Sequence, residues 1–207
     1  MKTQFNYPEY AEIKGKKYKI NTDFRVAIRC NDISMDPEID QIEKGFAILF
    51  LLFGSEALDD IKKNTDLIEE FCNKAYKYLQ CGEETDYKKK KEEDPDMDFV
   101  KDMPYIEASF MSDYNINLED TTMHWWKFYY LLCGLSNSEM GNCCVLNRIR
   151  NIRNLDLNEI KNVKEKQKMK EAKEHFALKK VKKEKKFTQE ELKNMEEYHR
   201  LIEKRKE

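Results

Sequence analysis

An apolar and aromatic stretch from residue 103 to residue 152 constrains the fold of this chain more than any other feature of the sequence. It reads MPYIEASFMSDYNINLEDTTMHWWKFYYLLCGLSNSEMGNCCVLNRIRNI, and the segments on either side of it are rich in Lys and Glu. The spacing of its apolar residues, interrupted by turn-forming residues, predicts three short helices. We place them at about residues 103–114, 121–133 and 138–152.

The middle helix of this stretch is apolar around nearly its whole circumference. Thr121 or Thr122 can cap its first turn, and Gly134 suits a left-handed helix end. Other elements must cover such a helix on several sides, or else its surface binds a partner. Because large aromatic side chains are most often buried, we favour the core. The residues expected to be mostly buried are Trp125, Phe128 and Leu132.

A recognisable pattern of residues runs through the same stretch. An Asp precedes the first helix, an uncommon His-Trp-Trp-x-Phe string opens the second, and a Gly-Leu pair closes it. The pattern comprises Asp102, Tyr105, Ile106, Phe110, Tyr114, Leu118, His124, Trp125, Trp126, Phe128, Leu132, Gly134, Leu135, Ile149 and Arg150, followed by Arg153. Together these residues resemble the core of a family of small bacteriophage proteins that are encoded beside the tail tape-measure gene and regarded as tail assembly chaperones. The resemblance is firmest over residues 102–153, thinner over 24–54 and absent from the C-terminal third.

The resemblance implies a non-catalytic assembly factor. Such a protein would bind the tape-measure protein during tail building, with tail-tube subunits as further candidate partners, and would be absent from the finished virion. A tape-measure helix exposes apolar stripes before the tube surrounds it, so a helical protein with an apolar groove is a chemically sensible partner. Family members often carry Gly and Asp where this chain has Asn115 and Asn117, and both asparagines still suit a turn.

The N-terminal part predicts a small β-hairpin over residues 10–20. Tyr10–Ile13 and Lys17–Ile20 alternate between apolar and polar residues, and Lys14-Gly15-Lys16 can turn between them. An isolated hairpin is marginal in water, so we expect this one to lean on helices.

Three amphipathic helices are predicted to follow the hairpin. The first is capped by Asn21 or Thr22, and the third begins at Asn64 or Thr65 and ends before Gly82. The second begins at Asp36-Pro37, a capping carboxylate followed by Pro, and ends at Gly54. Its apolar residues share one broad face: Ile39, Ile42, Phe46, Leu49, Phe50 and Phe53. We expect the three apolar faces to cover the aromatic helix.

Charge divides the chain into a body and an extension. The net charge of −2 combines 17 Lys and Arg against 12 Asp and Glu after Arg153 with 21 against 28 before that point. The sequence therefore predicts an all-α fold: a compact multi-helix body over residues 1–157 and a charged helical extension over 158–207. Residues 83–98, which mix both charges and have little to bury, predict a flexible connection within the body.

The extension carries only a thin apolar stripe. Residues 158–186 have strong helix formers, and a capping box of Thr188 and Glu191 marks a further helix start. A stripe this narrow either makes a small contact with the body or binds a partner. Its candidate partner-binding residues are Phe176, Val181, Met195 and Ile202.

Six lysines between residues 179 and 186 raise an alternative class, a nucleic-acid-binding or regulatory helical protein. Basic runs do neutralise phosphates. However, the run lacks interleaved aromatic or Arg residues for base contact, and the next helix is acidic. A solvated helical face is therefore the favoured interpretation, and nucleic acid is not an expected partner.

The sequence carries no specific signal for catalysis. His124 is the only histidine in the aromatic stretch, and no Cys, Asp or Glu stands at ligand spacing from it. We interpret it as a packing residue. The six cysteines lack any C-x-x-C pair and are read as reduced structural thiols. We therefore expect a protein that is not an enzyme and that uses no cofactor, metal or small-molecule substrate.

The sequence also predicts the compartment. No apolar run follows Lys2 as in a secretory signal, and the longest apolar run, from Phe46 to Phe53, is too short to cross a bilayer. We expect a cytoplasmic protein with no membrane association. Its oligomeric state does not follow from the sequence.

Overall fold

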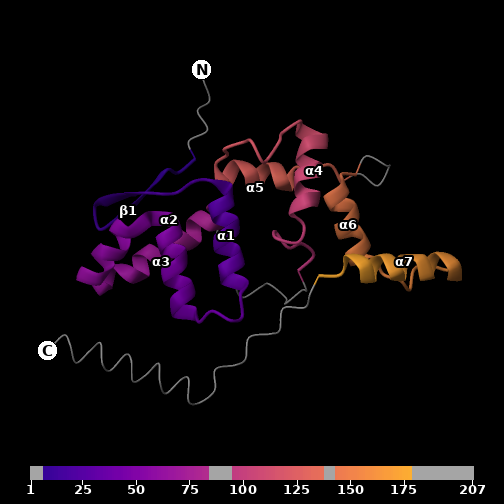
Figure 1. Cartoon of the computed structure of the whole chain (residues 1–207), viewed down its shortest axis with the longest axis horizontal. Helices are drawn as coiled ribbons and strands as arrows, with labels where there is room; N and C mark the ends of the chain where they lie inside the picture. Colours follow the sequence, from indigo (N-terminus) through magenta and orange to yellow (C-terminus); the bar gives the residue numbers. More distant parts are fainter. Residues whose placement is uncertain (1–6, 84–94, 138–142, 179–207) are drawn as a thin grey trace, which may run out of the picture.

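The computed structural model describes residues 7–83, 95–137 and 143–178, and over these residues the chain is helical apart from one β-hairpin. The hairpin and helices α1–α3 form one group, and helices α4–α7 lie beside it (Figure 1). The predicted all-α fold with a minor N-terminal hairpin is confirmed.

The hairpin pairs β1 (Tyr10–Ile13) with β2 (Lys16–Lys19) in antiparallel register, Ile13 opposite Lys16. Its turn residues Lys14 and Gly15 both have positive φ, +48° and +80°, as a two-residue hairpin turn requires. Tyr18 donates its hydroxyl proton to Asp60 at 2.9 Å, and Lys16 bonds the same carboxylate at 2.6 Å. The hairpin is thereby fastened to α2, as the sequence predicts.

Helices α1 (Phe24–Met35) and α2 (Gln41–Lys63) begin later than predicted. The side chain of Asp23, and not Asn21 or Thr22, caps α1. Asp36-Pro37 does not start a helix, because the Asp36 N–H bonds back to Ile33 O and ends α1. The start of α2 is set instead by Asp40, whose carboxylate accepts from the N–H groups of Ile42 and Glu43.

Gly54 interrupts α2 as predicted, with a φ of +77° that favours glycine. The chain does not end its helix there, however, but continues through Lys63. Asn64 then caps a short 3₁₀ turn, η1 (Thr65–Leu67), which leads into α3 (Ile68–Leu79). Helix α3 ends before Gly82, which has a φ of +80° and donates its N–H to Lys77 O. A Cβ at Gly82 would lie 3.0 Å from the Trp126 ring, so this close approach requires glycine.

Helix α4 (Met103–Tyr114) ends as predicted, with Asn115 in the left-handed region at φ +54°. Helix α5 (Trp125–Cys133) begins later than predicted, because its cap is His124 and not Thr121 or Thr122. Gly134 does end α5, but at φ −85°, which is not the left-handed conformation expected of it.

Helix α6 (Val145–Asn154) begins several residues after the predicted Ser138. Residues 138–142 lie outside the described part of the chain. The N-cap of α6 is Cys144, whose sulfur accepts from Asn147 N at 3.4 Å, an arrangement that helix-start preferences do not anticipate. Ser109 of α4 also accepts from Leu146 N at 3.1 Å, which holds the start of α6 against α4.

The core is centred on Phe128, which is fully buried. Its ring lies 4.5 Å from that of Phe24, 5.1 Å from that of Phe110 and 5.8 Å from that of Trp125, all centroid to centroid. Helices α1, α4 and α5 therefore meet at one aromatic stack. The predicted burial of Trp125, Phe128 and Leu132 is confirmed.

Both indole N–H groups join α5 to the end of α3. Trp125 Nε1 donates to Leu79 O at 2.9 Å, and Trp126 Nε1 donates to Tyr78 O at 2.8 Å. Both carbonyls belong to the last turn of α3, and the Tyr78 carbonyl also accepts from Cys81 N at 3.0 Å. The two tryptophans thus satisfy a helix end as well as fill the core.

Helix α7 (Val163–Phe176) carries no buried residue and packs on the body through its C-terminal end. The Phe176 ring lies 6.2 Å from that of Tyr105, and its carbonyl accepts from Arg153 Nε at 2.8 Å. The division of the chain at residue 157 remains a prediction. The lysine run 179–186, the capping box at Thr188 and the rest of the extension lie outside the described residues.

Part of the predicted flexible connection is held against the body. Residues 84–94 lie outside the described chain, but the Asp96 carboxylate bonds Arg150 Nε at 3.0 Å and Nη2 at 2.8 Å. Asp98 caps the following turn through the N–H groups of Val100 and Lys101. The flexible connection stays a prediction, and at its C-terminal end Asp96 has hydrogen-bond partners in Arg150 and Arg153 of α6.

Candidate functional site

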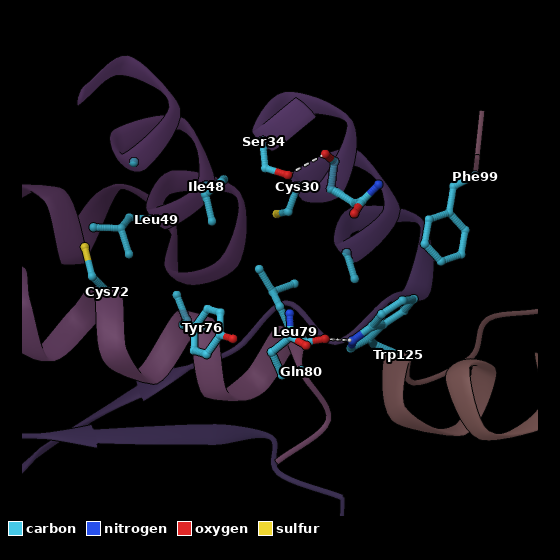
Figure 2. A pocket seen from close by; sticks show the side chains of 14 residues that line it. Cys30, Ser34, Ile48, Leu49, Cys72, Tyr76, Leu79, Gln80, Phe99 and Trp125 are labelled. Carbon is cyan, nitrogen blue, oxygen red and sulfur yellow. Dashed lines mark hydrogen bonds between the residues drawn. The ribbon is translucent and has the colours of Figure 1, made fainter. Parts of the chain in front are cut away.

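An apolar hollow of about 330 Å³ lies between helices α1, α2 and α3, with Phe99 and Trp125 at one end (Figure 2). We call it the α1–α3 groove. The residues that line it are Ala27, Cys30, Asn31, Ser34, Gly45, Ile48, Leu49, Cys72, Ala75, Tyr76, Leu79, Gln80, Phe99 and Trp125. Each of the three helices contributes one wall, so the groove follows directly from their packing.

Small side chains keep this groove open. Ala27 on α1, Gly45 on α2 and Ala75 on α3 stand where larger residues would fill the space between the helices. A Cβ built on Gly45 would meet no heavy atom within 4 Å. The helices therefore contact one another below the groove and leave a hollow along its length.

A stripe of exposed apolar side chains runs along α2 beside the groove. Ile42, Phe46 and Phe50 recur every four residues and remain 48%, 40% and 50% exposed. On the same helix only Leu49 and Phe53 of the predicted broad apolar face are buried. The expectation that this face would cover the aromatic helix is therefore wrong for the stripe, because α1 and α3 reach only one side of α2.

Two polar groups at the groove wall are hydrogen-bonded to backbone carbonyls. Ser34 Oγ donates to Asn31 O at 2.7 Å, and the Trp125 indole N–H donates to Leu79 O. Burial raises the pKa of the Cys30 thiol to about 12 and also raises the pKa of Cys72, so both thiols stay protonated at neutral pH. The groove therefore offers shape and a mainly apolar surface to a ligand, and none of its lining residues carries a charge.

Most residues of the sequence pattern lie in the core or pack against it, and one of them also lines the groove. Asp102, Ile106, Phe110, Leu118, Phe128, Leu132, Leu135 and Ile149 are buried, and Trp125 reaches the groove from the core. Tyr114 donates its hydroxyl proton to Leu131 O at 2.9 Å. Gly134 allows that contact, since a Cβ there would lie 3.0 Å from the Tyr114 hydroxyl oxygen.

Asp102 and Arg153 form an ion pair that is almost completely buried. The guanidinium meets the carboxylate through two bonds of 2.7 and 2.6 Å, and the two side chains are 6% and 0% exposed. Arg153 also donates to Asp96 O and Phe176 O, and the Asp98 N–H donates to Asp102. This pair therefore joins α4, α6, the end of α7 and the 96–102 segment at one point.

His124 serves as a structural cap. Its Nδ1 accepts from Trp126 N at 3.1 Å, and its Nε2 lies 3.1 Å from Pro8 O. The two contacts together require the neutral tautomer with a proton on Nε2. Desolvation lowers the pKa of His124, which favours the same neutral form. The packing role predicted for this residue thus includes hydrogen bonds from both ring nitrogens.

The candidate partner-binding residues of the extension are not brought together by the described structure. Phe176 rests on Tyr105. Val181, Met195 and Ile202 lie outside the described residues. All six cysteines are free thiols, with Cys30, Cys81 and Cys144 buried and Cys72 and Cys133 exposed.

Sequence reasoning did not single out the groove, although one signal was present. Five positions of the predicted apolar face lie on α2, which is broader than a single packing contact needs. An apolar face that is wider than its packing contact indicates a helix with some apolar residues exposed. Which side stays exposed depends on the placement of α1 and α3, and that is a tertiary property.

Two further features of the described residues bear on the class of site. Among them, no three His, Cys, Asp or Glu side chains are grouped so as to hold a metal ion. None of the helices in the described ranges has the length and apolar character needed to cross a membrane.

Comparison with known proteins identifies the family. A family model described as "Bacteriophage Gp15 protein" matches residues 6–178, which include every described helix and the groove. The match continues through α7, so the related region extends further toward the C-terminus than the pattern over residues 102–153 indicates. No curated protein and no solved structure matches the chain. This chain belongs to the Bacteriophage Gp15 protein family.

Proposed function

We propose that this protein is a non-catalytic tail assembly chaperone that binds an apolar helical segment of the phage tape-measure protein in the α1–α3 groove. Tail-tube subunits are further candidate partners. The protein acts in the host cytoplasm while the tail is built. Its chemistry is reversible shielding of apolar surface, without bond making or breaking.

The observation that carries this proposal is the groove with the stripe beside it. An amphipathic helix binds a groove through apolar anchors on one face, spaced three and four residues apart. The volume of about 330 Å³ is at the low end of the roughly 300–1,000 Å³ of ligand pockets, enough for side-chain anchors of a helix. Ile42, Phe46 and Phe50 extend the apolar contact beyond the hollow.

Two observations support the proposal further. Family membership gives a phage context, in which a long helical protein must be kept from aggregating before its tube assembles. The exposed apolar side chains of α2 are also what a protein that shields such surface transiently needs, since continuous apolar patches on a soluble protein usually mark a binding site.

The test is capture of the tape-measure protein encoded in the same phage genome, co-expressed with full-length chain. Gly45→Met should fill the groove without breaking α2, because Met is a good helix former and the site is open. We expect capture to fall about tenfold or more, equal to about 1.4 kcal/mol. The matched control is Gly45→Ala, which leaves most of the hollow free and should bind normally.

A second pair of variants tests the stripe. Phe46→Ser should weaken capture, whereas Met111→Ser, equally exposed at 43% against 40% but on α4, should not. Equal capture by Gly45→Met, Phe46→Ser and the unmodified chain would mean that the partner does not use this face. Binding to DNA that falls steeply with salt would instead support the nucleic-acid alternative.

A further inference from the structure

The α1–α3 groove has a candidate occupant within the chain itself. We propose that residues 187–207 dock in the groove of the same molecule, with their apolar face inward, and that a partner must displace them. The docking stands on the observations below, whereas its regulatory meaning rests on the proposed function.

The segment has the residue pattern that the groove requires. It reads FTQEELKNMEEYHRLIEKRKE, and Thr188 with Glu191 forms a capping box that predicts a helix start. Leu192, Met195 and Ile202 are spaced by three and seven residues, so they share one face of a helix, with Tyr198 beside them. That face is a narrow apolar stripe, which suits a groove better than it suits a core.

The described chain ends close to one end of the groove. The Phe176 carbonyl accepts from Arg153, and the Ala177 carbonyl accepts from Lys101. Lys101 lies two residues from Phe99, which lines the groove beside Trp125. The C-terminal end of α7 accordingly points toward the α1 side of the molecule (Figure 1). The described chain therefore ends near the end of the groove that Phe99 lines.

The remaining chain is long enough to fill the groove. Residues 179–186 can span up to about 25–30 Å when extended. The 12 residues of α1 measure about 18 Å, so this connection exceeds the length of the groove wall. A helix over residues 188–207 would measure about 30 Å and could cover both the hollow and the stripe on α2.

Attachment favours the chain's own segment over a second copy. Attachment within one chain through a short connection gives a local concentration on the order of millimolar, so even weak apolar contacts can close the groove within one molecule. A protein solution at micromolar concentration cannot compete with that. A closed groove also lowers the apparent affinity for any other ligand by the fraction of molecules that remain open. The segment would thus select for partners that bind strongly.

Two exposed thiols provide the test in the full-length protein alone. Cys72 lines the groove, whereas Cys133 is exposed on α5 and does not. Alkylation at about pH 8.5, near the ordinary pKa of a thiol, is followed residue by residue by mass spectrometry. We expect the double variant Met195→Glu with Ile202→Glu to raise the Cys72 rate at least threefold and to leave Cys133 unchanged.

The matched control alters the opposite face of the segment. Glu197→Gln with Arg200→Gln keeps the net charge and the apolar stripe, so both thiols should react as in the unmodified chain. A synthetic peptide of residues 187–207 added to the Met195→Glu, Ile202→Glu chain should restore protection of Cys72.

Three outcomes would overturn the inference. The first is an equal Cys72 rate in the unmodified chain and the double variant. The second is loss of Cys72 protection on dilution, which would assign the groove to a second copy. The third is an equal rise of the Cys72 and Cys133 rates in the double variant, which would indicate partial unfolding. The thiol experiment contains no partner, so its result does not depend on whether partner capture succeeds. If docking fails, the proposed function is still tested separately by the groove and stripe variants.

Discussion

The aromatic stack of α4, α5 and α1 and the groove of α1, α2 and α3 use similar side chains in opposite ways. In the stack, Phe128 is fully buried and meets three other rings within 6 Å. On α2, Phe46 and Phe50 are 40% and 50% exposed beside a hollow. Helix α1 takes part in both regions, because Phe24 stacks on Phe128 and Ala27 lines the groove.

The difference teaches that apolar composition does not distinguish core from binding surface in this protein. What distinguishes them is whether a neighbouring element completes the contact. Around Phe128 helices close on every side, and polar groups such as the indole N–H groups find carbonyl partners. Along α2, the side chains of Ile42, Phe46 and Phe50 stay exposed because α1 and α3 reach only one side of the helix. The aromatic stack thus contributes most to folding stability, and the groove with its stripe keeps apolar surface available for binding.

The largest expected effect comes from truncating one phenylalanine in each region. Phe128→Ala should lower the free energy of unfolding by about 3–5 kcal/mol, because it removes a fully buried ring from a close-packed stack. Phe46→Ala should cost about 1 kcal/mol or less, because its ring is already partly solvated. Urea denaturation of both variants measures the comparison. Equal losses would show that the stripe on α2 contributes to the fold as the stack does.

The buried ion pair should give the next largest effect. Arg153→Met leaves the Asp102 carboxylate buried without its cation and should cost about 3 kcal/mol, at the lower end of the range for broken buried pairs. Asp102→Leu combined with Arg153→Met should cost less than the sum of the two single changes, because neither charge is then left alone. Arg148→Met, on the exposed part of α6, is the control. Additive losses would mean that the two side chains are not coupled.

The smallest effect concerns the cap of α5 and depends on pH. His124→Ala removes the acceptor for Trp126 N and should cost about 1 kcal/mol, whereas His124→Asn keeps an acceptor and should cost less. The groups that face this ring are Tyr7, Glu9, Tyr78 and Trp126.

The sign of the pH dependence follows from the lowered pKa. Because the folded-state pKa of His124 lies below its unfolded value, the stabilisation is complete above about pH 6.5 and is lost as pH falls through that value toward the folded pKa. His124→Asn should flatten this loss between about pH 7 and pH 5. Carboxylates with lowered pKa, such as Asp60 at about 2, act only at lower pH and leave this window clear. An unchanged slope in the variant would exclude His124 as its source.

Local signals in the sequence predicted several elements closely. Lys14-Gly15-Lys16 predicted the hairpin turn and Asn115 the end of α4, because each conformation is decided by the residues that adopt it. Gly54 was predicted to end its helix and instead marks a kink, beyond which α2 continues to Lys63. The boundaries that were wrong depend on competition between caps. Asp36 and Asp40 are both capping residues, and only the backbone bond that ends α1 at Asp36 leaves the start of α2 to Asp40.

The groove could not be derived in the same way. Its walls come from three helices, and its volume depends on the space that the small side chains at Ala27, Gly45 and Ala75 leave unfilled between them. The buried pair of Asp102 and Arg153 was visible only as two members of a sequence pattern. That their charges meet is a consequence of packing α6 on α4, which no spacing in the sequence encodes.

The two bonds between indoles and the end of α3 have a spectroscopic consequence. Trp125 and Trp126 are the only tryptophans in the chain, and both donate to carbonyls of the same helical turn. Intrinsic fluorescence therefore reports on a single joint of the molecule. Trp125 also lines the hollow, so its fluorescence emission should change when an apolar ligand enters. Trp126 packs against Gly82 and does not line the hollow, so its emission should change less. The protein thus carries an optical probe at the surface proposed for binding, and no label has to be attached.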